Sequence, residues 1–311
     1  MTNTNINSKV GYTLPIKSAF EMFYASREAM GVTVRTMQYY KWNGRKITEW
    51  FEKNGIYSVH DITKRDIDAY LTELRKANQA DNSISVKARV IKSFLIYLRD
   101  SEEILEKIPR ITMPRIHKKE LRTLTSADVN KVLSECKSIR ELSLVLLMVD
   151  SGLRRNEVIN LNWKDVDLST GRLAVHYGKG DKFRVSAIGK QTKKHLIRYK
   201  IDLEACDPSL VHDDMPMFQT VSGDRFTDYG FRSLMLRLSQ KSGIKFSPHV
   251  LRRTFAKLAV KSGMNIIYIQ QLMGHANIDT TRSYIQNLDD EDILENHAKF
   301  GVVDNQIKKI R

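Results

Sequence analysis

The chain has 311 residues, of which 41% are hydrophobic and 28% are charged, a composition typical of a folded protein and not of a disordered one. Its 51 Lys and Arg residues outnumber 36 acidic residues, and the basic excess is present both up to Met113 (18 against 13) and after it (33 against 23). A polyanion that contacts both parts, above all nucleic acid, is therefore favoured as a partner, although a merely soluble basic protein would share this charge.

Several protein classes are disfavoured by what the sequence lacks. No apolar run reaches the roughly 18 residues that a membrane span needs, and residues 1–15 lack the apolar segment of a secretory signal. The two cysteines, Cys136 and Cys206, have no metal-ligand spacing, so we expect neither a disulfide framework nor a metal site. These features predict a cytoplasmic protein that is not inserted in a membrane.

Residues 16–100 are expected to be helical, because apolar residues recur at helical spacing in four ranges. These ranges are 16–30, 33–55, 62–78 and 83–105. Gly44 is expected to interrupt the second range, and Thr63 followed by Asp66 is a variant of the capping box that begins the third. Four or five helices in one compact basic domain are therefore predicted.

The last of these helices carries a candidate DNA-binding face. Its apolar stripe runs from Val86 to Leu98 and is expected to face the core. Lys87, Arg89 and Lys92 lie away from that stripe. We therefore predict that these three side chains face outward and bind DNA.

Residues 105–122 differ in character from the ranges on either side. Pro109 and Pro114 cannot continue a helix, and basic residues crowd the stretch. Two interpretations remain open, a solvated linker and a basic connector that lies along a duplex. On the second interpretation, the DNA-binding residues are Arg110, Arg115, Lys118 and Lys119.

The remainder of the chain predicts a mainly helical domain with a small antiparallel sheet. Ser126 is expected to begin its first helix, and an apolar helix follows at 142–150. Residues 173–188 alternate around a Gly-Lys-Gly-Asp turn and predict a β-hairpin. Helical spacing returns in the ranges 229–243, 248–263 and 265–274.

Polar residues in the range 151–161 and in the predicted hairpin are hard to explain by packing. Arg154 follows the helix-ending Gly152 at the start of the next helix, where a cation opposes the helix dipole. Glu157 is expected on the same face and could orient the guanidinium group. Taken alone, this pair also fits an exposed ion pair, and Lys179 at the hairpin tip also fits a solvated turn lysine.

Two later segments raise the same question. His249 and Arg252 lie three residues apart at the start of a helix, an end that favours anions, and so fit a phosphate site better than a core. His275 follows a helix-stopping glycine, and Tyr284 lies nine residues later among polar residues. Taken alone, these two fit a helix cap and a surface packing residue.

The sequence resembles the tyrosine recombinases, the family of phage integrases and Xer-type site-specific recombinases. The resemblance rests on four motifs in chain order: G-L-R-x-x-E, the hairpin lysine, H-x-x-R, and G-H followed by Y. The resemblance covers nearly the whole chain. Each motif is loose, but the joint order and spacing are specific to this family. Asn156 replaces a frequent serine and Arg155 adds a charge, and neither difference removes a reacting group.

The resemblance implies a cationic pocket for the scissile phosphate. Arg154 and Arg252 match the two arginines that clamp this phosphate. Glu157 matches the acidic residue behind the first arginine, and His275 matches the final histidine of the set.

The resemblance also implies the reacting groups. Tyr284 matches the nucleophile, Lys179 the lysine that protonates the leaving 5′-oxygen, and His249 the histidine that we take as the general base. The product would be a 3′-phosphotyrosyl intermediate and then a Holliday junction, with no metal, ATP or other cofactor.

The family architecture implies four segments. A helical, SAM-like core-binding domain would occupy 1–104, a basic interdomain linker 105–122, a mixed α/β catalytic domain 123–288 and a C-terminal tail 289–311. The two domains would form a clamp on DNA. The tail would dock on a neighbouring protomer and so build a homotetramer on two double-stranded recombination sites.

The biological role stays open at this level. An Xer-like or mobile-element recombinase, for integration, excision or resolution, would act at the nucleoid in the cytoplasm of a bacterium or archaeon, with or without an accessory or directionality protein. Two other functions are a non-catalytic DNA-binding protein on the same scaffold and a cleavage-religation enzyme of the type IB topoisomerase kind. The target DNA sequence depends on which side chains reach base edges, which the protein sequence does not give.

Overall fold

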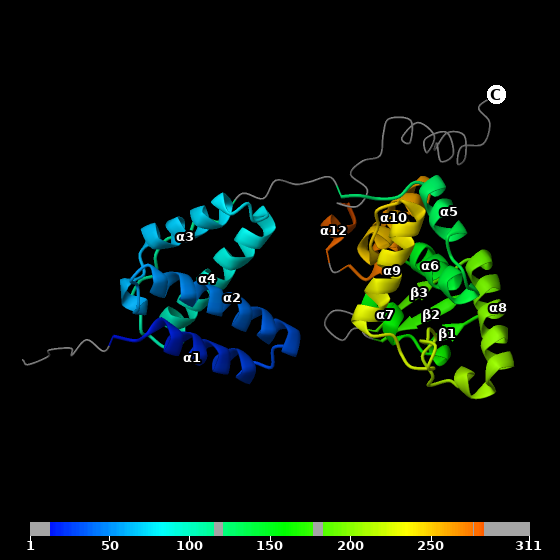
Figure 1. Cartoon of the computed structure of the whole chain (residues 1–311), viewed down its shortest axis with the longest axis horizontal. Coiled ribbons are helices and arrows are strands. Elements are labelled where there is room, and N and C mark those ends of the chain that lie inside the picture. Colours follow the sequence, from blue (N-terminus) through cyan, green and yellow to red (C-terminus); the bar gives the residue numbers. More distant parts are fainter. Residues whose placement is uncertain (1–12, 115–120, 177–182, 276, 283–311) are drawn as a thin grey trace, which may run out of the picture. The chain divides into compact units, whose positions relative to one another are not determined.

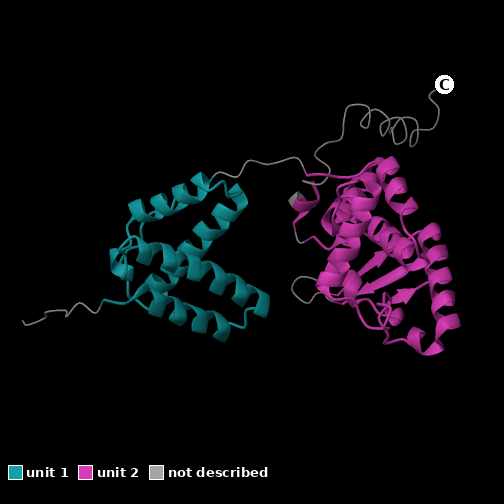
Figure 2. Cartoon of the chain, viewed as in Figure 1, with its two compact units in different colours: residues 1–119 teal, residues 120–311 magenta. Residues whose placement is uncertain are grey.

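The computed structural model describes residues 13–114, 121–176, 183–275 and 277–282. The chain divides into two compact units, residues 1–119 and 120–311 (Figure 2), and each is described by itself. The described residues are mainly helical and include one small antiparallel sheet, which confirms the predicted fold class. No helix in the described ranges is long and apolar enough to cross a lipid bilayer.

Unit 1 is a helical bundle with an aromatic centre. Phe20 and Phe94 stack with 3.9 Å between ring centroids, and Phe23 meets Phe94 edge-on at 5.9 Å. These buried rings join the first long helix to the last. The elements of the unit (Figure 1) are α1 (Ile16–Ala29), α2 (Val34–Lys53), η1 (Val59–Asp61), α3 (Lys64–Lys76) and α4 (Asp81–Asp100).

Helix α2 runs unbroken through Gly44, so the predicted interruption there is wrong. A Cβ atom at Gly44 would lie 2.0 Å from the Tyr24 hydroxyl and 3.0 Å from the Phe20 ring. The missing side chain therefore lets α1 and α2 approach closely. That packing offsets the roughly 1 kcal/mol that a glycine costs inside a helix.

The ends of α3 and α4 test two further expectations. Thr63 N–H donates to Asp66 Oδ2 at 2.8 Å, and Asp66 N–H donates to Thr63 Oγ1 at 3.4 Å, which confirms the capping box. Helix α4 begins at Asp81 and ends at Asp100, so it starts before the predicted range and stops short of Leu105.

Unit 2 is built around α6 (Ile139–Ser151), which packs against α8 (Lys190–Cys206) and α10 (Pro248–Lys261). Leu144, Val145, Leu147 and Met148 are all fully buried, as expected for a helix that is covered on several sides. The other described elements are α5 (Ser126–Ser134), α7 (Arg155–Asn160), η2 (Trp163–Asp165), β1 (Val166–Asp167), β2 (Arg172–Val175), β3 (Arg184–Ala187), α8 (Lys190–Cys206), η3 (Pro208–Val211), α9 (Asp228–Ser242), α10 (Pro248–Lys261), α11 (Ile266–Met273) and α12 (Ile278–Arg282).

The sheet has the order β1-β2-β3 and is antiparallel throughout. Strands β2 and β3 form the predicted hairpin, with Leu173 opposite Ser186 and Val175 opposite Arg184. The hairpin tip, which includes Lys179, lies outside the described residues.

Helix α5 begins at Ser126, as predicted, but two elements of unit 2 were missed. Thr125 caps α5, because Thr125 Oγ1 accepts from Asp128 N–H at 3.1 Å and Asp128 Oδ2 accepts from Thr125 N–H at 2.9 Å. Helix α8 was not predicted, since only Thr192, Leu196 and Tyr199 of its residues are buried and the apolar spacing is weak. Strand β1 was not predicted either, because it has only two residues.

Candidate active site

The turn between α6 and α7 places the first two candidate residues. Gly152 ends α6 at φ +61°, a left-handed conformation that favours glycine, and an added Cβ would lie 2.3 Å from the Phe255 ring. The chain then enters α7 with Arg154 at the N-cap and Glu157 in the first turn. The sequence interval between the two residues therefore brings their side chains together.

The Glu157 carboxylate accepts four hydrogen bonds, about as many as a carboxylate can take. Its Oε1 accepts from Arg154 Nη1 at 2.8 Å and from Arg184 Nη1 at 2.7 Å. Its Oε2 accepts from the Arg154 backbone N–H at 2.6 Å and from Arg184 Nη2 at 2.7 Å. The Glu157 side chain is only 1% exposed, so the alternative of an exposed ion pair is excluded.

Burial and the arginines act on Glu157 in opposite directions. Burial would raise the pKa of this carboxyl group, but the hydrogen bonds and charges of Arg184 and Arg154 outweigh it and hold the pKa below the ordinary value. Arg252 Nη1 adds a third cation at 4.0 Å from Glu157 Oε2. Glu157 is therefore an ionised centre around which arginines gather.

The C-terminal end of α11 provides acceptors for the same arginines. The carbonyl oxygens of residues 272, 273 and 274 accept, in that order, from Arg184 Nε at 3.1 Å, Arg252 Nη2 at 2.7 Å and Arg154 Nη2 at 2.9 Å. The last carbonyls of a helix lack partners within the helix and carry the negative end of its dipole. Three successive carbonyls are thus satisfied by three cations from three other segments of the chain.

Arg252 lies deeper than the sequence predicted. A side chain projecting from the start of α10 was expected, but Arg252 is 2% exposed, and its Nη1 donates to the Gly152 carbonyl at 2.5 Å. Acceptors from the ends of α6 and α11 make this burial tolerable. Arg154, with 28% of its side chain exposed, is the more accessible of the two candidate clamp residues.

His249 occupies the first turn of α10 and is exposed. Its pKa is lowered from the ordinary value, first by local desolvation and then by the charges of Arg253, Arg155, Arg252 and Arg154. The imidazole is therefore neutral near pH 7 and able to accept a proton.

His275 follows α11 directly and is buried. Gly274 ends α11 at φ +67°, as the sequence indicated, and His275 Nδ1 lies 2.8 Å from Thr281 Oγ1 of α12. Burial, followed by the charges of Arg252, Arg154 and Arg184, lowers the pKa of His275 to about 4. This histidine is therefore also neutral near pH 7, and Thr281, which the sequence did not single out, is its side-chain partner.

Arg184 is the main residue that sequence reasoning missed. It is 12% exposed on β3 and occupies both oxygens of Glu157. A signal was available in the strand pattern, because alternation places Arg184 on the same face as the buried Ser186. Lys179 and Tyr284, in contrast, lie outside the described residues, so only the sequence matches them to roles.

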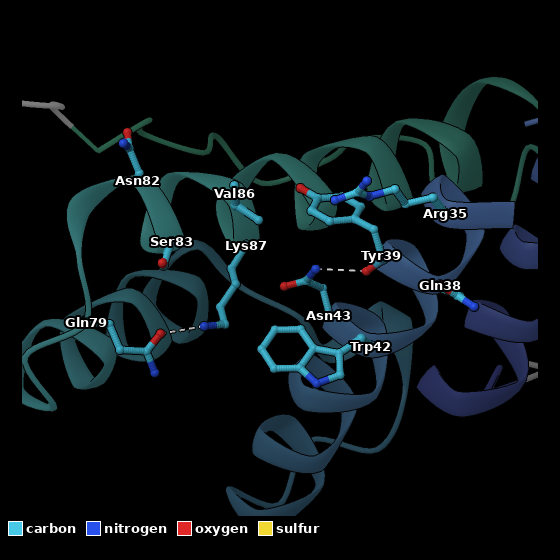
Figure 3. A pocket seen from close by; sticks show the side chains of 10 residues that line it. All are labelled: Arg35, Gln38, Tyr39, Trp42, Asn43, Gln79, Asn82, Ser83, Val86 and Lys87. Atoms are coloured by element: carbon cyan, nitrogen blue, oxygen red, sulfur yellow. Dashed lines mark hydrogen bonds between the residues drawn. The ribbon is translucent and has the colours of Figure 1, made fainter. Parts of the chain in front are cut away.

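In unit 1, Lys87 needs a correction of its orientation. It was expected to face outward, but it is 5% exposed and lines a pocket between α2 and α4 (Figure 3). Its Nζ donates to Gln79 Oε1 at 2.5 Å and lies 5.8 Å from the centre of the Trp42 ring, and burial lowers its pKa. The reason is that α4 contacts α1, α2 and α3, so side chains beside its apolar stripe are covered too.

The other predicted DNA-binding residues of unit 1 divide into two groups. Arg89, Lys92 and Arg110 are exposed, as predicted for side chains that contact DNA. Arg115, Lys118 and Lys119 lie outside the described residues. The pocket beside Lys87 also includes Arg35, and no carboxylate lines it.

The arginine cluster of unit 2 fits an anionic ligand. Arg154, Arg184 and Arg252 bring three permanent positive charges to a single carboxylate, Glu157. The charges of Arg154 and Arg252 also act on His249, whose pKa they help to lower. Such preorganised donors stabilise negative charge that develops on phosphate oxygens during displacement at phosphorus.

Comparisons with known proteins also match this chain to the family that its sequence resembles. Residues 114–291 match the model of the phage integrase family. The tyrosine recombinase XerA of Saccharolobus solfataricus is 29% identical over 228 residues, which span 72% of this chain and 74% of that protein.

Two solved structures extend the similarity to the fold. A crystal structure of XerA recombinase is 25% identical and covers 91% of this chain and 98% of its own, with a TM-score of 0.51. The Tn1549 transposon integrase in complex with a circular intermediate DNA aligns with a TM-score of 0.75 at 16% identity, over 93% of this chain and 100% of its own. At that identity the second likeness shows a shared fold.

Proposed function

This chain belongs to the phage integrase family, and on that premise we propose that it is a tyrosine site-specific recombinase that cleaves and rejoins double-stranded DNA. The observation that carries the proposal is the buried Glu157 carboxylate, around which Arg154 and Arg252 are held together with the end of α11. Arginine suits this position because its planar fork matches two phosphate oxygens and its charge is permanent.

We assign the scissile phosphate to the space beside Arg154. Arg154 is accessible and would donate directly to a non-bridging oxygen, while the more deeply placed Arg252 would add its charge from inside the protein. Both cations stabilise the extra negative charge that the phosphorus centre carries in the transition state. His275, neutral and buried, would complete this pocket as a hydrogen-bonding group.

The chemical step transfers the phosphoryl group from the DNA strand to the enzyme. The Tyr284 oxygen attacks phosphorus, the bond from phosphorus to the 5′-oxygen breaks, and a 3′-phosphotyrosyl bond forms. His249, with its lowered pKa, would take the phenol proton. Lys179 would supply the proton that the leaving 5′-oxygen needs.

Rejoining reverses these steps with a new strand. A 5′-hydroxyl of the partner DNA attacks the phosphorus of the phosphotyrosyl link and gives its proton to Lys179, and Tyr284 leaves with a proton returned from His249. The bond energy is conserved in the covalent intermediate, so we propose that no ATP, metal or other cofactor takes part. Exchange of one strand pair gives a Holliday junction, and exchange of the second resolves it.

Binding to the recombination site would involve both units. We propose that residues 1–104 form the core-binding domain, 105–122 the connector and 123–288 the catalytic domain, closing on DNA as a clamp. Exposed Arg89, Lys92 and Arg110 would contact phosphates, as would Arg115, Lys118 and Lys119. We place Lys87 at the same surface as a lining residue of the pocket between α2 and α4.

Assembly and biological role complete the proposal. Residues 289–311 would dock on a neighbouring protomer and so form a homotetramer on two DNA sites. The enzyme would be an Xer-like or mobile-element recombinase of the cytoplasm, acting at the nucleoid. An accessory protein could set its direction. Deletion of residues 290–311 is expected to abolish pairing of two sites while single-site binding persists, and unchanged recombination would contradict this role of the tail.

Trapping of the covalent intermediate tests the proposed chemistry. The full-length chain is incubated with nicked, fragmented genomic DNA, and fragments that remain bound to protein in detergent are sequenced. Wild-type protein is expected to give adducts at short, recurring sites, and Tyr284→Phe to give none.

Three outcomes would redirect the assignment. Adducts with Tyr284→Phe would remove Tyr284 as the nucleophile. Relaxation of supercoiled plasmid without sequence preference would favour a cleavage-religation enzyme. Sequence-specific binding without any adduct would leave a DNA-binding protein.

A further inference from the structure

We propose that Arg184 is a positioning residue for the phosphate clamp, acting through Glu157 and the end of α11. This inference rests on the proposed recombinase function and deepens it. None of the motifs that carry the family resemblance includes Arg184, which lies on β3, while Arg154 is the N-cap residue of α7 and Arg252 lies on α10. Its effect on the reaction would therefore pass entirely through its neighbours.

The first contact is with the carboxylate that orients Arg154. Arg184 Nη1 and Nη2 each donate to a different oxygen of Glu157, at 2.7 Å in both cases. This bidentate pair fixes the plane of the carboxylate group. The remaining acceptor positions of Glu157 then point at the backbone N–H and Nη1 of Arg154, at 2.6 and 2.8 Å.

The second contact is with the helix end that orients both clamp arginines. Arg184 Nε donates to the Leu272 carbonyl at 3.1 Å, and the next two carbonyls accept from Arg252 and Arg154. Gly274 is pressed against the Arg184 side chain, because an added Cβ would lie 2.7 Å from Arg184 Cδ and Nε. One guanidinium group therefore touches both supports of the clamp.

The shape of the side chain matters as well as its charge. A lysine at this position has a single nitrogen, which cannot span both Glu157 oxygens and reach the Leu272 carbonyl at once. Arg184 is 12% exposed and its main partner 1%, so water does not readily replace the lost contacts. We therefore expect Arg184→Lys to loosen the clamp while keeping the local charge, and Arg184→Gln to loosen it further.

A purely structural role would look different from a positioning role. If Arg184 only stabilised unit 2, its loss would lower thermal stability and reduce all activities of the site alike. If Arg184 positions the clamp, its loss slows adduct formation most when the scissile phosphate carries the negative charge that the clamp neutralises. A scissile phosphate in which methyl replaces one non-bridging oxygen is uncharged and removes most of that demand.

The experiment compares these two substrates. Wild-type, Arg184→Lys, Arg184→Gln and Arg172→Gln proteins react with a nicked duplex of the site recovered from wild-type adducts, with either a normal or a methylphosphonate linkage at the scissile position. Arg172 is the matched control, because it is an exposed arginine on the neighbouring strand β2. Gel shift on the intact site and thermal unfolding are measured for each protein.

The expected pattern is specific. On the normal phosphate, Arg184→Gln forms adduct about 100-fold more slowly, as for a reacting group displaced by about 1 Å, and Arg184→Lys lies between it and the wild type. On the methylphosphonate, all four proteins react at similar rates. Site binding stays at the wild-type level, and Arg172→Gln behaves as wild type throughout.

Several results would overturn the positioning role. They are wild-type rates for both Arg184 variants, an equal loss on both substrates, or failure of both variants to fold, which would assign Arg184 to stability alone. A wild-type protein that forms no adduct would instead remove the recombinase proposal. Wild-type cleavage with unaffected Arg184 variants removes only the inference about Arg184.

Discussion

Replacement of Glu157 by glutamine should cost unit 2 much of its stability. Glutamine keeps the shape of the side chain but puts an NH₂ group where one oxygen accepts from Arg154 and Arg184. Arg184 and Arg252, with 12% and 3% of their side chains exposed, would then be left with unbalanced charge. Breaking a buried pair by removing one partner costs about 3–5 kcal/mol.

That loss should be visible by scanning calorimetry of the full chain. For a unit of this size each kcal/mol shifts the melting temperature by about 2–4 °C, so the unit 2 transition should fall by roughly 6–20 °C, with unit 1 unchanged. Glu141→Gln is the matched control, because Glu141 is buried but has one partly exposed arginine partner, Arg237. A loss with Glu157→Gln no larger than with Glu141→Gln would refute the reasoning.

The same variant has a defined pH signature. The folded-state pKa of Glu157 is lowered, so its stabilising contribution is fully present above the unfolded-state pKa and is lost as the pH falls through the folded-state value. The stability difference between wild type and Glu157→Gln should therefore shrink on acidification. A constant difference down to pH 3 would contradict ionisation of Glu157 as the cause.

Three further predictions concern other parts of the chain. Gly44→Ala should destabilise unit 1 by about 1–3 kcal/mol in urea unfolding, because the new Cβ meets the Tyr24 hydroxyl; unchanged stability would mean that α1 and α2 separate at little cost. Folding lowers the pKa of His275 from its ordinary 6.5 to about 4, so the free energy of unfolding should fall by about 2 kcal/mol from pH 7.5 to 5. His275→Gln should remove that part of the slope, and an identical slope would contradict it. Arg89→Ala and Lys92→Ala should each weaken binding to any duplex in fluorescence anisotropy, and each should lower the slope of log affinity against log salt concentration by about 1. An altered sequence preference with an unchanged slope would contradict phosphate contacts.

Local signals in the sequence were sufficient for much of the fold. Periodicity located most helices, because the cores of both units are apolar and their helices amphipathic, and the capping pair Thr63–Asp66 marked the start of α3 to the residue. Gly44 misled because a glycine in a helix can serve close packing with another segment, which no local pattern contains. Helix α8 was missed because it buries few side chains.

The site shows the same division between local and distant information. Arg154 and Glu157 are near in sequence, so their contact followed from helix geometry. Arg184 lies on β3 and contacts Glu157 of α7 and the Leu272 carbonyl of α11, and neither contact leaves a trace in local spacing. The depth of Arg252 was likewise invisible, because it depends on carbonyls from two helix ends.

The use of backbone carbonyls at the end of α11 has a consequence for how such a site tolerates sequence drift. A carbonyl acceptor is present whatever side chain its residue carries, so substitutions at Leu272 or Met273 leave the acceptors of Arg184 and Arg252 in place. Selection then acts on the path of the chain and falls most heavily on Gly274, whose left-handed conformation and contact with Arg184 few other residues could reproduce. Comparison of sequences would register this as an invariant glycine rather than as co-varying partners of the arginines.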